Sequence, residues 1–179
     1  VVTDAGGALV LMSAERARDL PGGDRAVYIL GSGEGTESVI VSQMDDLESF
    51  GPFRRGAKEA FETAGVTHDD IDHVMFYDAF AHLPLYMLED TGFVGKGESA
   101  AFSKEGHTRP GGKLPINTQG GGLSYTHSGM YGMFAIQEAV RQLRGEAVVQ
   151  VPDVRTSCVH GVGIMFGAGG SRVLGNQRP

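Results

Sequence analysis

The segment from Asn117 to His127 constrains this chain more than any other stretch. Three consecutive glycines at 120–122 are followed by an apolar residue and then by His127. Glycine lets the backbone turn sharply and pass close to a substrate. An amphipathic segment at 130–143 begins directly afterwards, so His127 stands where a turn leads into a helix. A histidine in that place either hydrogen-bonds an oxygen that gains charge during a reaction or is incidental to the turn.

Helical and strand patterns alternate along the rest of the chain. Short apolar runs predict strands at 6–12, 26–30, 71–76, 147–151, 157–166 and 171–175. Helical spacing and caps predict helices at 13–17, 53–64, 79–88 and 128–143. Residues 92–116 lack periodicity and are predicted to form a long loop with little regular structure. This alternation predicts an α/β fold in which helices and a sheet form layers.

The composition is that of an ordinary globular domain. A length of 179 residues is enough for a sizeable core, and the net charge of −7 argues against nucleic-acid binding. The single cysteine, Cys158, excludes an intrachain disulfide and fits a reducing compartment, so we expect a cytoplasmic protein. No apolar run approaches the roughly 18 residues of a membrane-spanning helix, so we expect no membrane span.

Two further clusters hold groups that can do chemistry. Tyr77 and Asp78 follow the strand predicted at 71–76, and polar side chains in such places are common in α/β active sites. The alternative is that Asp78 caps the next helix while the Tyr77 ring packs at the rim. Near the C-terminus, Cys158 and His160 precede a glycine-rich turn. A buried free cysteine is usually inert packing, but a histidine two residues away adds a titratable group.

Two other patterns are weak. The Gly-Ser-Gly-Glu-Gly run at 31–35 looks like a phosphate loop but lacks both the Lys-Ser/Thr ending and the third glycine of a dinucleotide fingerprint. The remaining histidines show no metal-ligand spacing, and no CxxC, HExxH or EF-hand pattern occurs. We therefore expect no structural metal.

Three motifs, in order, resemble the C-terminal half of thiolases, specifically the sterol-carrier-protein-type and acetyl-CoA acetyltransferase-like branch. Where that family has Asn-Glu-Ala-Phe after a strand, this chain has Tyr-Asp-Ala-Phe at 77–80. Where the family has Gly-Gly-x-x-x-x-Gly-His-Pro, the chain has Gly-Gly-Leu-Ser-Tyr-Thr-His-Ser at 121–128. The family's late Cys-x-Gly corresponds to Cys-Val-His at 158–160.

The resemblance implies an α-β-α-β-α layered sandwich built from two similar halves and usually found as a dimer. Residues 1–24 would be the last strand and helix of the N-terminal half, and 25–179 the C-terminal thiolase domain. The nucleophilic cysteine of thiolases lies in the first half, upstream of Val1, which is not an initiator Met. We therefore expect an N-terminal half, in the same chain or a separate one, to complete the protein.

The resemblance also implies an acyltransferase that makes or breaks a C–C bond of a 3-oxoacyl-CoA, with the coenzyme A thioester as substrate and no bound cofactor. His127 would polarise the thioester oxygen. Cys158 would move the proton at the substrate α-carbon, unless His160, which replaces the family glycine, carries it instead. Tyr77 replaces the family asparagine that orients a water, and its phenol is a second candidate acid or base.

Two other classes of function remain open. Thiolase-fold proteins that use tyrosines cleave acyl-CoA side chains by retro-aldol chemistry, which would make this chain part of a lyase. A non-catalytic scaffold subunit is the other class, supporting a zinc-ribbon/OB-fold partner of the kind that some members of this branch bind. The loop at 92–116 either shapes an acyl pocket or is simply solvated.

Overall fold

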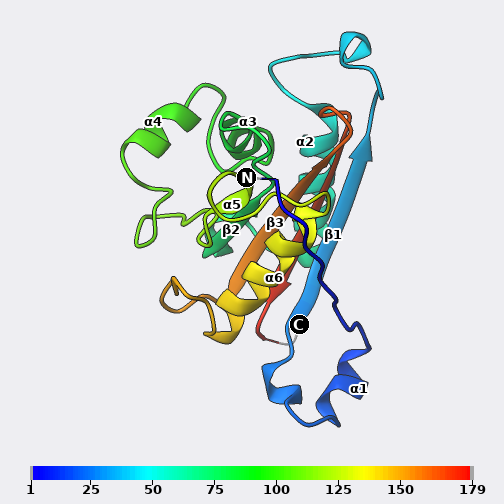
Figure 1. Ribbon diagram of the computed structural model, residues 1–179, viewed down its shortest axis with the longest axis vertical. Coiled ribbons are helices and arrows are strands. Elements are labelled where there is room, and N and C mark those ends of the chain that lie inside the picture. The colour runs from blue at the N-terminus through cyan, green and yellow to red at the C-terminus, as the bar shows by residue number, and fades with distance from the viewer. Residues whose placement is uncertain (1, 178–179) are drawn as a thin grey trace.

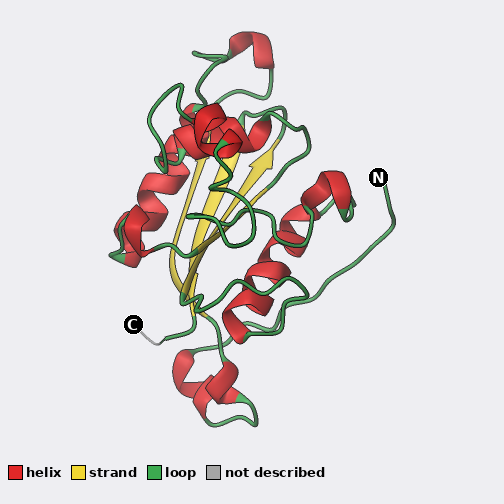
Figure 2. Ribbon diagram, turned by 90° about the vertical axis from the view of Figure 1, so that its left-hand side faces the viewer, coloured by secondary structure: helices red, strands yellow, loops and turns green. Residues whose placement is uncertain are grey.

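A four-stranded sheet organises the computed structural model, which describes residues 2–177. Its strand order is β1-β4-β3-β2, with β2 parallel to β3 and β4 antiparallel to both β1 and β3. The strands are β1 (Tyr28–Thr36), β2 (His73–Phe76), β3 (Thr156–Gly163) and β4 (Ala168–Gly175). Figure 2 shows helices on both sides of this sheet, so the predicted layered α/β architecture is confirmed.

Two long helices, α2 (Gly51–Ala64) and α6 (Tyr131–Arg144), flank the sheet (Figure 1). Gly65 ends α2 in a left-handed conformation with φ 67°, the C-cap that the sequence predicts. The shorter helices are α1 (Ala14–Arg18), α3 (Leu83–Asp90), α4 (Ser99–Lys104) and α5 (Gly121–Ser124). Single 3₁₀ turns are η1 (Gly23–Arg25), η2 (Val41–Gln43) and η3 (His68–Asp70). No helix of residues 2–177 is long and apolar enough to cross a membrane.

Each long helix covers its own face of the sheet and has its own apolar core. On the α2 face, Phe53 packs in one cluster with Phe76 and Cys158. On the α6 face, Tyr131 belongs to a second cluster with Val159. Side chains of successive strand residues point to opposite faces. This alternation decides which of the predicted site residues can meet.

The Gly-Ser-Gly-Glu-Gly run at 31–35 lies within β1, where it forms the surface on which α2 packs. A β-carbon on Gly31 would lie 2.2 Å from the Ala60 carbonyl oxygen, and one on Gly33 would lie 2.3 Å from that of Gly56. The glycines therefore let the helix backbone approach the strand more closely than any side chain would allow. The resemblance to a phosphate loop thus has a structural explanation.

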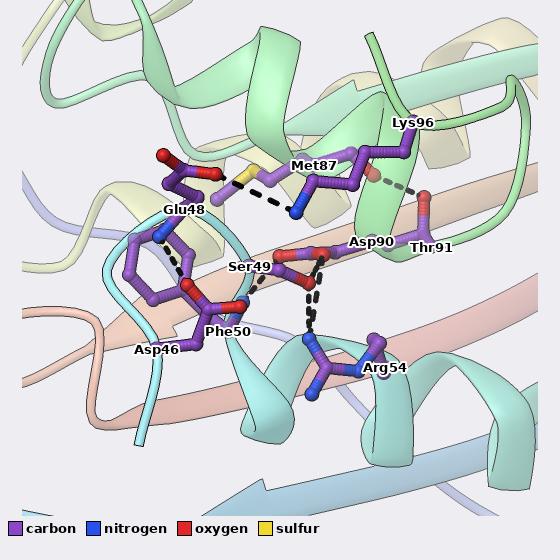
Figure 3. A network of polar contacts seen from close by, with 9 residues as sticks. All are labelled: Asp46, Glu48, Ser49, Phe50, Arg54, Met87, Asp90, Thr91 and Lys96. Atoms are coloured by element: carbon purple, nitrogen blue, oxygen red, sulfur yellow. Dashed lines mark hydrogen bonds and ion pairs between the residues drawn. The ribbon is translucent and has the colours of Figure 1, made fainter. Parts of the chain in front are cut away.

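Asp90, at the end of α3, caps the start of α2 (Figure 3). Its Oδ2 accepts the Phe50 N–H at 2.7 Å, its Oδ1 accepts the Ser49 hydroxyl at 2.5 Å, and the Arg54 guanidinium lies 3.7 Å from Oδ1. The side chain of the N-cap residue Phe50 makes no capping hydrogen bond, and a residue 40 positions away accepts the N–H of Phe50 just before the helix. This contact joins the end of α3 to the start of α2.

Two predicted strands, 6–12 and 147–151, are wrong. Residues 6–12 are irregular and have no strand partner among the described residues; Val10 is 83% exposed. Upstream of this segment, Val2 forms an isolated bridge with His127. In 147–151 the Gln142 carboxamide takes the place of a neighbouring strand, donating to the Val149 carbonyl at 2.8 Å and accepting the Val151 N–H at 2.9 Å.

Other predicted elements form with shifted ends. The helix predicted from 79 begins at Leu83, with Pro84 in its first turn, where a missing N–H costs nothing. The strand predicted at 26–30 extends to Thr36. The loop at 92–116 contains α4, and its Phe93 and Phe102 pack against the α2-face core instead of facing solvent.

Candidate active site

Tyr77 and His127 form the centre of the candidate site. The Tyr77 hydroxyl oxygen lies 3.2 Å from His127 Nε2, and the two rings meet edge to face with their centroids 5.6 Å apart. Tyr77 directly follows β2, and its N–H donates to the His160 carbonyl at 3.0 Å, which holds it at the end of the sheet. Both side chains are partly exposed. The structure therefore brings together two of the residues that the sequence predicts as catalytic, 50 positions apart.

The glycine turn allows this approach. Gly121 has φ 67°, and a β-carbon on it would lie 2.1 Å from Asp78 Oδ2. A β-carbon on Gly122 would lie 2.9 Å from His127 Cδ2. The Gly122 N–H donates to Asp78 Oδ1 at 2.6 Å, so Asp78 caps the short helix α5 and not the helix after 79. Asp78 thereby fixes the turn against the end of β2.

Burial sets the protonation of the site. Desolvation raises the pKa of the Tyr77 phenol, and the neighbouring Asp78 carboxylate raises it further. Desolvation also raises the pKa of Asp78, although hydrogen bonds from the Gly122 N–H and its neighbours oppose that shift. The Tyr77 phenol therefore keeps its proton at neutral pH and can donate it.

Tyr131 is a site residue that the sequence analysis missed. Its fully buried ring packs edge-on against Tyr77 at 5.2 Å and stacks on His127 at 6.4 Å. Its hydroxyl accepts a hydrogen bond from Gln119 Nε2 at 3.1 Å, and burial raises the pKa of the phenol. Its only sequence signal was its place in the amphipathic segment at 130–143, which predicts packing against the sheet and not a place in the site.

Cys158 and His160 do not join this site. Cys158 is fully buried on the α2 face, and desolvation raises its pKa to about 12. The His160 ring lies 4.8 Å from Phe53 on the same face, and its Nδ1 is 2.7 Å from Ser171 Oγ; burial lowers its pKa to about 3. Because side chains alternate along β3, residues 158 and 160 point away from α6. The structure thus separates them from Tyr131 and the His127 imidazole that packs on it.

The described residues offer no metal centre at this site: across 2–177, no three His, Cys, Asp or Glu side chains gather closely enough to hold an ion. A groove of about 930 Å³ lies elsewhere, between residues 8–29, α6 and β4, with Ile136, Val140 and Leu174 in its walls. Its lining is mostly apolar and includes neither Tyr77 nor His127.

The sequence matches the family model described as "Thiolase C-terminal domain-like" over residues 33–176. It is 36% identical, over 85% of its length, to the steroid side-chain-cleaving aldolase of Thermomonospora curvata, and covers 39% of that protein. It is 38% identical to the 17-hydroxy-3-oxo-4-pregnene-20-carboxyl-CoA lyase of Mycobacterium tuberculosis, again over 85% of this chain and 39% of the relative. It is also 33% identical to an acetyl-CoA acetyltransferase of Methanothermobacter thermautotrophicus, over 97% of this chain and 44% of the relative.

Solved structures give the same picture. The Ltp2-ChsH2(DUF35) aldolase superposes with a TM-score of 0.80 at 32% identity, over 90% of this chain and 42% of that one. A monomeric SCP2-thiolase-like protein of Mycobacterium smegmatis shares the fold, with a TM-score of 0.71 at 21% identity, over 94% of this chain and 33% of that one. The chain thus spans about two fifths of the length of the curated relatives above.

Proposed function

Because this chain belongs to the thiolase C-terminal domain-like family, whose members above are enzymes, we propose that the complete protein cleaves a C–C bond beside a coenzyme A thioester by retro-aldol chemistry. The observation that carries the proposal is the 3.2 Å contact between the Tyr77 phenol and His127 Nε2, in a site that contains no thiol from the described residues. The substrate class is a 3-hydroxyacyl-CoA. The acyl transfer that the motifs first suggest becomes the second candidate.

In the proposed reaction Tyr77 acts as a proton relay. Its oxygen accepts the proton of the substrate β-hydroxyl while its own proton passes to His127 Nε2, which requires the tautomer protonated at Nδ1. The Cα–Cβ bond breaks, its electron pair forms the thioester enolate, and the β-carbon becomes the carbonyl of an aldehyde or ketone. The proton then returns from the imidazolium through Tyr77 to Cα, which gives the shortened acyl-CoA. A relay suits a phenol with a raised pKa, because no free phenolate has to form.

Acyl transfer of the thiolase type uses the same histidine differently. The His127 imidazole would donate to the thioester oxygen, and a cysteine from another part of the protein would carry the acyl group. The 33% identity to an acetyl-CoA acetyltransferase supports this candidate. Cys158 does not fit as its proton carrier, because the thiol is buried with a pKa raised to about 12.

The deciding experiment uses Tyr77→Phe and His127→Ala in the complete protein, with Tyr86→Phe in α3 as the matched control. With a 3-hydroxyacyl-CoA, we expect both site variants to lose about 100-fold in kcat, while the control keeps normal activity. The carbonyl product and the shortened acyl-CoA are measured together. If the protein instead cleaves a 3-oxoacyl-CoA by thiolysis and releases no aldehyde or ketone, the result would support acyl transfer. The absence of both activities, with a partner co-purifying, would support a scaffold.

We further propose that the 930 Å³ groove receives the N-terminal half of the thiolase fold. Its exposed apolar residues, which include Val10 and Leu11, would be covered there, and the relatives' greater length supports such a half. The similar Ltp2-ChsH2(DUF35) aldolase is named as an assembly of two proteins, which supports a partner protein for the complete protein. We propose that this partner is of the zinc-ribbon/OB-fold kind. Co-purification of such a partner with the complete protein tests the second point.

A further inference from the structure

The Gln119 carboxamide touches both structures that hold the reactive pair. Its Oε1 accepts the Gly121 N–H at 3.3 Å, at the start of the turn that leads to His127. Its Nε2 donates to the Tyr131 hydroxyl at 3.1 Å. One side chain therefore connects the glycine turn with Tyr131.

Tyr131 is the ring of the site that packing holds in place. It is fully buried, and its ring contacts both Tyr77, at 5.2 Å and 87°, and His127, at 6.4 Å and 24°. Tyr77 and His127 are themselves partly exposed, and both rings pack on Tyr131. The orientation of the pair therefore depends on where the Tyr131 ring is held.

The backbone of Gln119 is anchored by the residue before it. The Thr118 hydroxyl donates to Glu138 Oε1 at 2.7 Å and accepts from Gln142 Nε2 at 2.9 Å, and it lies 3.1 Å from His73 Nε2. All four side chains are buried, and they join β2 to α6. A satisfied buried network of this kind holds its members in one arrangement. Gln119 is therefore attached to a rigid part of the core.

We propose that Gln119 is a positioning residue for the Tyr77–His127 pair and that it acts through the Tyr131 hydroxyl. The expected fall in kcat rests on the proposed function. The expected change in the position of the His127 ring does not. Neither hydrogen bond of the Gln119 carboxamide involves the Tyr77 or His127 side chain. Its role is to fix the Tyr131 ring so that the Tyr77 oxygen and His127 Nε2 stay within proton-transfer distance.

The test uses Gln119→Met, Tyr131→Phe and the double variant in the complete protein, with Gln43→Met in the 3₁₀ turn η2, where residue 43 is exposed, as the matched control. For Gln119→Met we expect kcat to fall about 10-fold with KM within twofold of normal. The NMR resonance of His127 Cε1–H should move or broaden, and the control should change neither quantity. In the double variant kcat should equal that of Tyr131→Phe. The Tyr131→Phe change already removes the hydrogen bond to Gln119, so changing Gln119 as well should have no further effect.

Unchanged kcat and an unchanged His127 resonance in Gln119→Met would overturn the inference, as would losses that multiply in the double variant. Tyr131→Phe removes the same hydrogen bond from the other side, so it serves if Gln119→Met does not fold. If Tyr77→Phe and His127→Ala leave activity intact, the proposed function fails on its own. The His127 resonance still reports on Gln119 in that case.

Discussion

Gly122 and His127 are packed so closely that a β-carbon on residue 122 would lie 2.9 Å from the imidazole Cδ2. The same β-carbon would lie 3.2 Å from Asp78 Oδ1, whose hydrogen bond from the Gly122 N–H fixes the turn. The absence of a side chain at residue 122 is thus a condition for the geometry of the site.

Gly122→Ala should therefore displace the imidazole, and we expect kcat of the complete protein to fall about 100-fold, as for other small misplacements of a catalytic group. Gly132→Ala in α6 is the matched control, because nothing lies within 4 Å of its β-carbon. That control should gain about 0.5 kcal/mol of stability, since alanine is the better helix former. Equal activity in the two variants would show that the close contact at 122 is unimportant.

Asp90→Ala should lower the free energy of unfolding by about 2 kcal/mol, because it removes the cap of α2 and leaves the Phe50 N–H without that acceptor. Asp46→Ala is the control, since Asp46 accepts the Glu48 N–H in an exposed turn and should change stability by less than about 0.5 kcal/mol. Urea unfolding of both variants measures the difference. A loss no larger for Asp90 than for Asp46 would show that the cap adds nothing.

Stability should fall with acid between about pH 6.5 and pH 5. Burial lowers the pKa of His73 to about 4 and that of His160 to about 3, so the folded protein keeps both neutral where the unfolded chain binds protons. Each histidine should then contribute a slope of about 1.4 kcal/mol per pH unit below the ordinary histidine pKa, and none above it.

His160→Gln should remove about half of that slope, whereas His82→Gln, at an exposed position, should leave it unchanged. Urea unfolding at a series of pH values measures the slopes. A pH-independent unfolding free energy in this window would contradict the burial of the two neutral rings.

Cys158 should resist alkylation in the native protein at pH 8, because it is fully buried and its pKa is raised to about 12. Treatment with N-ethylmaleimide followed by mass spectrometry of the Cys158 peptide measures this, and unfolding in urea should expose the thiol to complete reaction. Rapid alkylation of Cys158 in the native protein would show that the thiol is accessible, and Cys158 would again be a candidate proton carrier.

The local pattern of the chain predicted those elements that depend on neighbours in sequence. The helix ending at Gly65, the amphipathic helix that became α6 and the buried strand before Tyr77 all form within a few residues of their predicted ends. Apolar runs at 6–12 and 147–151 also look like strands, but a strand needs a partner. The first finds none among the described residues, and Gln142 satisfies the backbone of the second.

The sequence by itself determined the layered α/β class, the family, and the presence of a histidine behind a glycine turn. Only the tertiary structure decided which candidates meet. Tyr77 and His127 do, because a strand end and a turn 50 residues away converge. Cys158 and His160 do not, because the two-residue period of β3 places them under α2. Residue types and spacing along a chain do not specify the face of the sheet, which depends on pairing with distant strands and helices.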